Sequence, residues 1–211
     1  MSLARLLQLA SPTLPVGAFS YSGGLEAAIE AGVVRDAAGA QRWIGDVLEF
    51  SLARMDAPLL WRMMQDEGSL EDWNALFLAS RETAELRAET VQMGYSLNRL
   101  AGELGIGEVH LTEPAFPAVF AHFASRWNID PRAALEAYLW SWLENQIMAA
   151  VKAVPLGQTE GQRMLLKLGD RIESLAKQSE TLPDQDLCNF TPGLAMLSAR
   201  HETQYSRLFR S

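Results

Sequence analysis

The side chains in this sequence that most readily bind metal are three histidines, His110, His122 and His201, and a single cysteine, Cys188. No two of the histidines are spaced to share one face of a helix, and Cys188 has no second cysteine at a zinc-ligand spacing. His122 and His201 lie in apolar patterns, which favour buried, hydrogen-bonded histidines, whereas His110 lies in an expected loop and stays a candidate for a weak metal or proton site. The sequence therefore predicts no metal site within one chain and no cofactor, and it leaves open a site shared across a dimer axis through His110 or Cys188.

The hydroxyl groups give no sign of nucleophilic catalysis, because a nucleophile needs a nearby base and a group that orients that base. Ser20 and Ser22 lie among glycines, but no histidine or lysine stands next to them, and the sequence has no Gly-x-Ser-x-Gly motif. Residues 157–161 lack the lysine of a nucleotide-binding P-loop, so we interpret them as a break between two helices. We therefore predict no catalytic residue and no enzymatic activity.

Three segments carry side chains that suit contact with another protein better than catalysis. The first is the Phe19 loop, residues 11–26, in which two prolines and three glycines flank the aromatic residues Phe19 and Tyr21. A structured turn that packs two aromatic rings is the plainer interpretation of this loop. The second, residues 149–158, contains Lys152 and Gln158; there a lysine at a helix end would also help to satisfy the last helix carbonyls.

The third is the C-terminal segment, residues 205–211. Arginine mixed with aromatic residues is typical of interface hot spots, although a frayed end is the alternative. The sequence shows no intramolecular reason for this composition, so we expect a partner to order the segment, and we expect it to form one partner surface with the Phe19 loop. Its candidate contact residues are Arg207, Leu208, Phe209, Arg210 and Ser211.

The composition describes an acidic chain with ample material for a core. Its 211 residues carry a net charge of −8 and are 48% hydrophobic, and we expect a single domain over residues 1–211. The negative charge argues against binding of nucleic acid or of anionic membrane surfaces. The first residues do not predict a signal peptide and no stretch predicts a membrane span, so we expect a cytoplasmic protein.

Apolar residues recur every three or four positions through most of the chain, which predicts an all-α helical bundle. Asp130 and Thr191 each precede a proline and resemble N-caps of helices. The helix expected over residues 133–151 has only two charged residues, Glu136 and Glu144. Because a helix that is apolar nearly all round is buried on both sides, we place it at the centre of the bundle, with part of it suited to a subunit interface.

Four stretches of the sequence, in this order, resemble the UreF family of urease accessory proteins. They are LLQLASPTLPVGAFSYSGGLE, RETAELRAET followed by MGYSLNRL, AAVKAVPLGQTEGQR, and the closing HETQYSRLFRS. The resemblance spans essentially the whole chain and includes the three segments described above.

The resemblance implies an all-α protein without an established catalytic activity that forms a homodimer and assists nickel insertion into urease. It implies that the chain binds the accessory protein UreD, called UreH in some organisms, and that the complex recruits the GTPase UreG and acts on urease apoprotein. The segments with Phe19 and Arg207 correspond to parts of the family that become ordered on UreD, and Lys152 corresponds to a position linked to the GTPase step. Glu136 and Trp140 correspond to positions near the family's dimer contact.

Two other classes of protein stay open on the sequence alone: a small helical enzyme of unknown substrate and a helical ligand-binding regulator. An enzyme would need a cleft with converging polar groups, and a regulator would usually carry a basic DNA-binding element. The sequence shows neither feature. Co-purification with homologues of UreD and UreG distinguishes an adaptor from both.

Overall fold

The computed structural model describes residues 3–211, and in this part of the chain it contains helices and no strand, which confirms the all-α prediction. None of these helices is both long enough and apolar enough to cross a membrane. The π-helix is η2 (Leu48–Asp56), and the 3-10 helices are η1 (Ala18–Ser20), η3 (Glu67–Ser69) and η4 (Asp184–Asp186). The α-helices are α1 (Leu3–Leu9), α2 (Leu25–Glu30), α3 (Ala37–Val47), α4 (Ala57–Gln65), α5 (Leu70–Ala79), α6 (Ala84–Glu103), α7 (Phe116–Arg126), α8 (Pro131–Ala153), α9 (Gln158–Gly169), α10 (Ile172–Thr181) and α11 (Pro192–His201).

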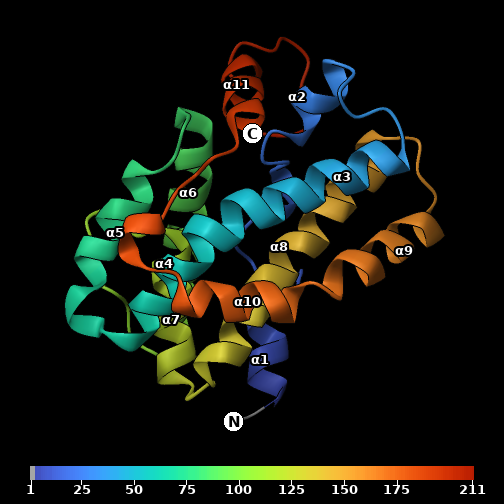
Figure 1. The fold of residues 1–211 in the computed structure, drawn as a ribbon. Helices are drawn as coiled ribbons and strands as arrows, with labels where there is room; N and C mark the ends of the chain where they lie inside the picture. The colour runs from blue at the N-terminus through green and yellow to red at the C-terminus, as the bar shows by residue number, and fades with distance from the viewer. Residues whose placement is uncertain (1–2) are drawn as a thin grey trace.

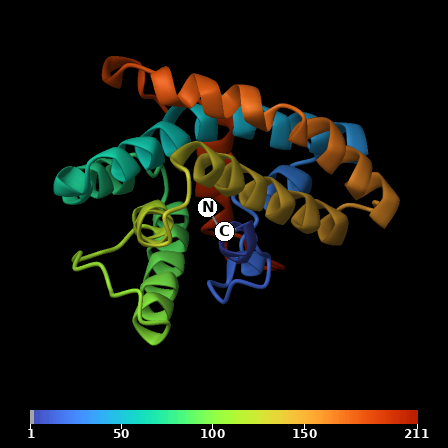
Figure 2. The ribbon, with the colours of Figure 1, turned by 90° about the horizontal axis from the view of Figure 1, so that it is seen from below.

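Helix α8 lies at the centre of the molecule, with α9 and α10 packed on one side and α1 and α7 on the other (Figures 1 and 2). Its start is the one that the sequence predicts, because the carboxylate of Asp130 accepts the N–H of Ala133 at 3.0 Å and Pro131 is the first helical residue. The prediction that this helix is central is confirmed. Its near absence of charge follows from contact with neighbouring helices on both sides. Its buried apolar side chains include Leu135, Tyr138, Leu139, Leu143 and Ile147.

Helices α3, η2 and α4 form one continuous helical run from Ala37 to Gln65. The middle part has π geometry, which is rare over this length and is frequent at functional sites. It carries two buried polar residues, Ser51 and Asp56, on the side that faces α6 and α8. The helical periodicity of the sequence predicts this run but not its π geometry, since a π turn differs from an α turn by only one residue.

The second predicted N-cap is confirmed in position, since Thr191 is the residue before Pro192 of α11, but it makes no capping hydrogen bond. Helix α11 begins at Pro192 as expected, but the hydroxyl of Thr191 caps no main-chain N–H and is buried without a hydrogen-bond partner within residues 3–211. The helix is held instead by packing against α2, and its buried residues include Leu194 and Leu197.

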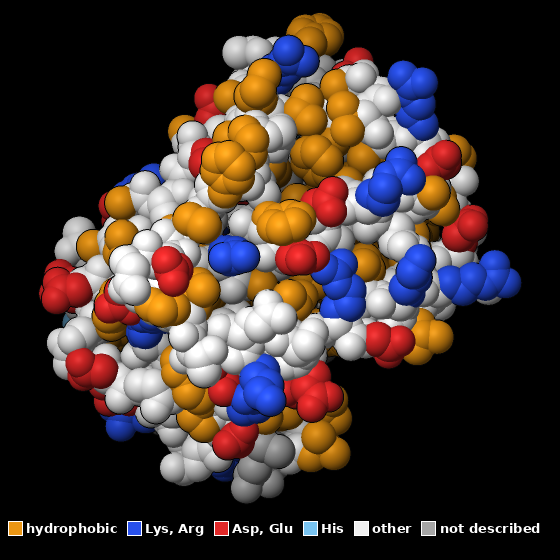
Figure 3. All heavy atoms as spheres, viewed as in Figure 1, with side chains coloured by type: hydrophobic (Ala, Val, Ile, Leu, Met, Phe, Trp, Pro, Cys, Tyr) orange, Lys and Arg blue, Asp and Glu red, His pale blue; other side chains and the backbone are white. Residues whose placement is uncertain are grey.

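Apolar side chains gather in the upper part of the face shown in Figure 3, over α11, α2 and the coil beside them, while charged side chains are spread over the rest of that face. An apolar patch at the surface is typical of a site for protein contact. The exposed large apolar residues on these elements include Val33, Phe190, Met196, Tyr205 and Leu208.

Candidate functional site

The Phe19 loop connects α1 to α2, and its shape depends on glycine. Gly17, Gly23 and Gly24 have φ angles of 80°, 56° and 81°, a backbone conformation that other residues rarely adopt. A Cβ atom on Gly24 would also lie 2.7 Å from a methyl carbon of Leu194 in α11, so this turn needs glycine for space as well as for conformation. The loop presents Phe19 at the surface, where the residue is 64% exposed.

Tyr21, two residues further along, is buried. Its hydroxyl donates to Oε1 of Gln92 in α6 at 3.0 Å, and its main-chain oxygen accepts from Nδ2 of Asn145 in α8 at 3.3 Å. Burial raises the pKa of this phenol, against the opposing effect of a hydrogen bond with Arg210. Tyr21 therefore ties the Phe19 loop to two helices and is not exposed for direct contact with a partner.

The C-terminal segment folds back against the Phe19 loop, near α11 and α2 (Figure 1). The main-chain N–H of Arg210 donates to the oxygen of Ser20 at 2.8 Å, and the N–H of Ser22 donates to the main-chain oxygen of Ser211 at 3.1 Å. The N–H of Gly23 donates to Oγ of Ser211 at 3.3 Å. The structure thus joins the two segments that we expected to form one surface.

Two glutamates hold the beginning of this segment. Glu26 in α2 accepts the main-chain N–H groups of Leu208 at 2.6 Å and Phe209 at 2.8 Å. Glu85 in α6 forms an ion pair of 2.6 Å with Nη1 of Arg207. Hydrogen bonds to a charged group are roughly twice as strong as neutral ones, so these contacts order the segment within the chain. They leave Leu208 62% exposed, whereas Phe209 is only 5% exposed.

His201, the last residue of α11, lies between the same two glutamates. Its ring is fully buried, with Nδ1 2.6 Å from Oε2 of Glu85 and Nε2 3.2 Å from Oε2 of Glu26. The prediction of a buried, hydrogen-bonded histidine is therefore confirmed. The expectation that only a partner orders the C-terminal segment is wrong, because Glu26, Glu85 and His201 together give the segment an intramolecular binding site.

The other candidate metal ligands lie apart from this site. His110 is exposed, and His122 is partly buried with Nε2 2.8 Å from the main-chain oxygen of Gly107. Cys188 is an exposed free thiol. Over the described residues, no three histidine, cysteine, aspartate or glutamate side chains gather in a way that could hold a metal ion.

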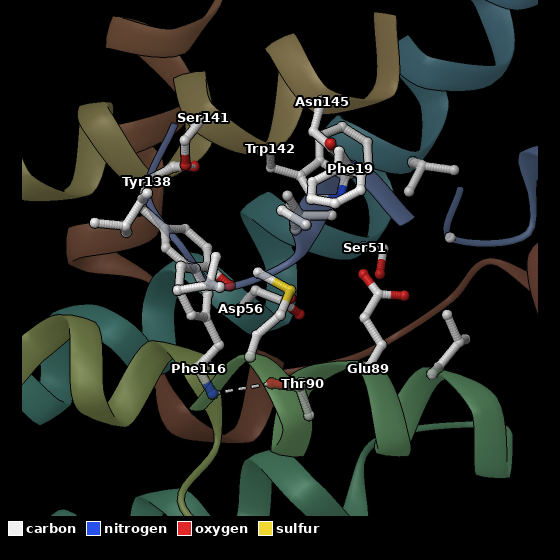
Figure 4. A pocket seen from close by; sticks show the side chains of 18 of the residues that line it. Phe19, Ser51, Asp56, Glu89, Thr90, Phe116, Tyr138, Ser141, Trp142 and Asn145 are labelled. Atoms are coloured by element: carbon white, nitrogen blue, oxygen red, sulfur yellow. Dashed lines mark hydrogen bonds between the residues drawn. The ribbon is translucent and has the colours of Figure 1, made fainter. Parts of the chain in front are cut away.

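A cavity of about 150 Å³ lies beneath Phe19, between α6, α8 and η2 (Figure 4). We call it the Glu89 cavity. Phe19, Trp142 and Asn145 line it on the side of the loop and α8, and Glu89 of α6 points into it from the opposite side. Much of the remaining lining is apolar and includes Leu52, Phe77, Met93 and Phe116.

An ion pair is built into the wall of this cavity. Arg81, just before α6, donates to the two carboxylate oxygens of Asp56 at 2.9 and 3.3 Å. The guanidinium also lies 4.2 Å from the centre of the Phe77 ring, within the range of a cation–π contact. Both charged side chains are largely buried, and the aspartate holds the pKa of Arg81 above its usual value against the opposing effect of burial.

Two further carboxylates line the same cavity. Burial raises the pKa of Glu89 to about 7, although the hydroxyl of Ser211, which donates to it at 2.6 Å, acts in the opposite direction. Burial also raises the pKa of Glu82. Sequence reasoning missed both residues. Glu82 lies in the bend before Thr83, the N-cap of α6, whereas Glu89 lies within that helix, so helical spacing gave no signal that the two would line one cavity.

The model of a family described as UreF matches residues 34–169, more than half of the chain. This chain belongs to the UreF family. It is 56% identical, over an alignment 225 residues long, to the urease accessory protein UreF of Azoarcus sp. (strain BH72). The alignment covers 100% of this chain and 96% of the relative. It is 54% identical over 224 residues to the same-named protein of Dechloromonas aromatica (strain RCB), with 100% and 98% covered.

A longer relative is named bifunctional urease accessory protein UreEF, from Bordetella bronchiseptica. It is 50% identical over 227 aligned residues, which cover 99% of this chain but 52% of the relative. The resemblance to the UreF family that the sequence motifs indicate is confirmed. The UreF family model does not reach the Phe19 loop or the C-terminal segment, but the alignments with the two UreF relatives above cover the whole of this chain.

Two of the remaining candidate residues of this UreF-family chain lie at the end of α8 and the start of α9. Lys152 is exposed in the last turn of α8, one turn beyond Met148, which lines the Glu89 cavity. Residues four positions apart share a helix face, so Lys152 projects from the side of α8 that faces the cavity. Gln158 is the first residue of α9 and is exposed.

The other two candidates, Glu136 and Trp140, lie one turn apart on the opposite side of α8. Trp140 is 38% exposed, and a Cβ atom on Gly169 of α9 would lie 3.1 Å from its ring, so α9 covers part of the indole. Burial raises the pKa of Glu136, with the charge of Arg132 opposing it. The structure therefore separates these two residues from the Phe19 loop by the width of α8.

Proposed function

We propose that this protein is a urease accessory protein, a non-enzymatic adaptor that binds the accessory protein UreD through the Phe19 loop and the C-terminal segment. The observation that carries the proposal is the hydrogen-bonded junction between these two segments, from Arg210 to Ser20 and from Ser22 and Gly23 to Ser211. Membership of the UreF family supports the assignment to urease maturation, since the matched relatives are named urease accessory proteins.

The exposed side chains of this joint surface suit a protein interface. Phe19 and Leu208 are both mostly exposed, although large apolar side chains are normally buried. Arg207 and Arg210 flank Leu208 and can make hydrogen bonds with carboxylate or main-chain oxygens of a partner. Because Glu26 and Glu85 already order this segment, binding of UreD would carry a smaller entropic cost than the ordering of a free chain end.

The two sides of α8 suit two different contacts. Lys152 lies on the cavity side, and we propose that it contributes to the site that recruits the GTPase UreG to the complex with UreD. Glu136 and Trp140 lie on the opposite side, and we propose that they contribute to a homodimer contact. Since the two sets of residues point in opposite directions, the homodimer and the UreD complex would not compete for one surface, and urease apoprotein would join through the complex.

The Glu89 cavity does not favour the alternative of a small helical enzyme. Its lining contains no histidine, cysteine or lysine among the described residues, and its serines, Ser11, Ser51 and Ser141, hydrogen-bond to Thr13, Asn189 and a main-chain oxygen rather than to a carboxylate that could act as their base. Its arginine is already paired with Asp56. A ligand-binding regulator would also need a second functional element, and the acidic composition does not suit DNA.

Binding of purified UreD to Phe19→Ala and Arg207→Ala variants tests the proposal. Loss of an interface hot spot costs ~2 kcal/mol or more, so each variant should bind UreD about 30-fold more weakly than the wild type. The matched control is Leu166→Ala, because Leu166 is an exposed apolar residue on α9. Melting temperatures of all variants should be measured alongside.

Unchanged UreD binding by both variants would contradict the proposal, and so would binding that is lost only together with the fold. Deletion of residues 206–211 is a poorer test, because it removes the buried Phe209 and the Ser211 hydroxyl that contacts Glu89. A second measurement is capture of UreG by the UreD complex, which should need UreD and should weaken when Lys152 is changed to alanine.

A further inference from the structure

The Glu89 cavity carries more negative charge than its own cation balances. Its lining contains one basic side chain, Arg81, and three carboxylates, Asp56, Glu82 and Glu89. Arg81 is engaged by both oxygens of Asp56 and by the Ser80 hydroxyl. Within residues 3–211, neither Glu82 nor Glu89 forms an ion pair.

Glu82 lines the cavity but is also exposed at the surface, whereas Glu89 is partly buried, and at both the ionised form is disfavoured. Burial is the largest cause of the raised pKa of Glu82 and of Glu89; the nearby charge of Arg81 lowers both pKa values in part, and the charge of Asp56 raises them. A cation that entered the cavity would favour the ionised form of both groups. The cavity therefore offers a site in which a positive charge from outside the chain is stabilised by two carboxylates.

The size and walls of the cavity limit what can carry that charge. A volume of about 150 Å³ is comparable to that of an engineered cavity known to hold a benzene molecule. Lysine and arginine side chains combine an apolar stem with a charged head, and they bury the stem along apolar surface. The walls provide such a surface, with Met93, Phe116 and Trp142 in the lining.

The cavity adjoins the surface to which we assign UreD binding. Phe19 lines the cavity and is also mostly exposed, so it forms part of the rim. Gly23, whose N–H donates to Ser211, lines it as well. A side chain that projects from a protein docked on the Phe19 loop and the C-terminal segment would therefore meet the mouth of the cavity.

We propose that the Glu89 cavity receives one basic side chain, a lysine or an arginine, from the protein that docks on the Phe19 loop and the C-terminal segment, and that Glu82 and Glu89 bind its charge. This inference rests on the proposed function. It adds a specificity pocket to that surface, in which the apolar walls hold the stem of the partner side chain and the two carboxylates select a cation over a neutral group.

A small-molecule experiment tests the cavity without a partner protein. Benzamidinium is an aromatic cation of suitable size, and benzamide is its neutral counterpart. The indole N–H signal of Trp142 in ¹⁵N-edited NMR, assigned through its loss in Trp142→Phe, reports binding. We expect benzamidinium to bind wild-type protein about tenfold more tightly than benzamide, because one charge-assisted contact contributes about that factor.

Substitutions of three glutamates, one just before α6 and two within it, give the matched comparison. Glu82→Gln and Glu89→Gln should each weaken benzamidinium binding about tenfold and leave benzamide binding unchanged, and Glu103→Gln should change neither, because Glu103 is exposed at the far end of α6. Equal binding of the two compounds, absence of benzamidinium binding, or wild-type affinity in both cavity variants would overturn the proposal. A Ni²⁺ titration that shifts the Trp142 signal in the wild type but not in the two variants would identify a metal ion as the occupant and would also overturn it.

The complex with UreD tests the partner side chain. Glu82→Gln should weaken UreD binding about tenfold, and one lysine or arginine of UreD should give the same loss on change to alanine, with no further loss in the double variant. Glu82→Gln gives the clearer test, because among the described residues Glu82 makes no hydrogen bond with the C-terminal segment. Glu89 accepts one from Ser211, so its substitution also changes that segment. Wild-type protein that fails to bind UreD would overturn the proposed function itself. If both glutamine variants bind UreD normally while Phe19→Ala binds it more weakly, the proposal for the Glu89 cavity is wrong and the proposed function stands.

Discussion

The carboxylate of Glu85 and the ring of His201 lie 2.6 Å apart, although 116 positions separate them in the sequence. The second oxygen of Glu85 pairs with Arg207, so one carboxylate links α6 to the end of α11 and to the C-terminal segment. Glu26 repeats this arrangement, because it accepts from the main chain of the segment and lies beside the other ring nitrogen of His201. The segment is therefore part of the folded protein before any partner binds.

Removal of the Glu26 carboxylate, which accepts two main-chain hydrogen bonds, should loosen the C-terminal segment. In Glu26→Ala, the main-chain N–H groups of Leu208 and Phe209 lose their shared carboxylate. Loss of a partner for such groups costs ~1–3 kcal/mol, so we expect hydrogen exchange of these two amides to be at least about fivefold faster. The control is Glu30→Ala, an exposed glutamate on the same helix. Wild-type exchange rates in Glu26→Ala would show that other contacts order the segment.

Neighbouring residues of the segment should differ sharply in their effect on stability. Phe209 is 5% exposed and Leu208 is 62% exposed. Truncation of a buried phenylalanine costs about 3 kcal/mol or more, so Phe209→Ala should lower the free energy of unfolding by that amount. Leu208→Ala should change it by less than about 0.5 kcal/mol. Urea unfolding of the two variants measures both values, and an equal effect would contradict the burial of Phe209.

Glu89 should make stability depend on pH. Its pKa is raised from 4.5 to about 7 in the folded protein, where Arg81, Asp56 and the Ser211 hydroxyl surround it. Between these pH values the folded state keeps a proton that the unfolded state releases, so its contribution is full below pH 4.5 and is lost as the pH rises through 7. The loss is up to roughly 3 kcal/mol.

Glu89→Gln should remove this decline, because glutamine does not ionise. The measurement is the free energy of unfolding in urea at pH 5 and at pH 8, for wild type and variant. We expect the difference between the two pH values to shrink by roughly 1–3 kcal/mol in the variant. A variant with the same pH dependence as the wild type would show that Glu89 is better solvated than its surroundings indicate.

The buried pair of Arg81 and Asp56 should be more sensitive to loss of one partner than of both. Arg81→Ala leaves the carboxylate of Asp56 buried without its cation, which typically costs about 3–5 kcal/mol of stability. The double variant Arg81→Met, Asp56→Leu should recover part of this loss, since it removes both buried charges. Thermal or urea unfolding measures the effect, and a double variant less stable than Arg81→Ala would argue that the ion pair itself stabilises the fold.

Most of the helices could be predicted from the sequence, because the patterns that indicate them involve residues close together in the chain. The apolar period of three to four residues predicts helices throughout, and the low charge of residues 133–151 predicts that α8 is buried on both sides. Asp130 before Pro131 predicts where that helix begins, since capping needs only neighbouring residues. The position of His201 in an apolar stripe likewise predicts its burial.

The contacts of the candidate site were decided only by the tertiary structure. Glu26, Glu85 and Glu89 look like ordinary surface glutamates in the sequence, and their role depends on Arg207, Phe209 and Ser211, which lie more than 120 positions away. The cavity likewise needs α6, α8 and η2 to meet. Periodicity along one chain determines which side of a helix is apolar. It carries no information on which distant polar group that side will meet, because this depends on how the helices pack.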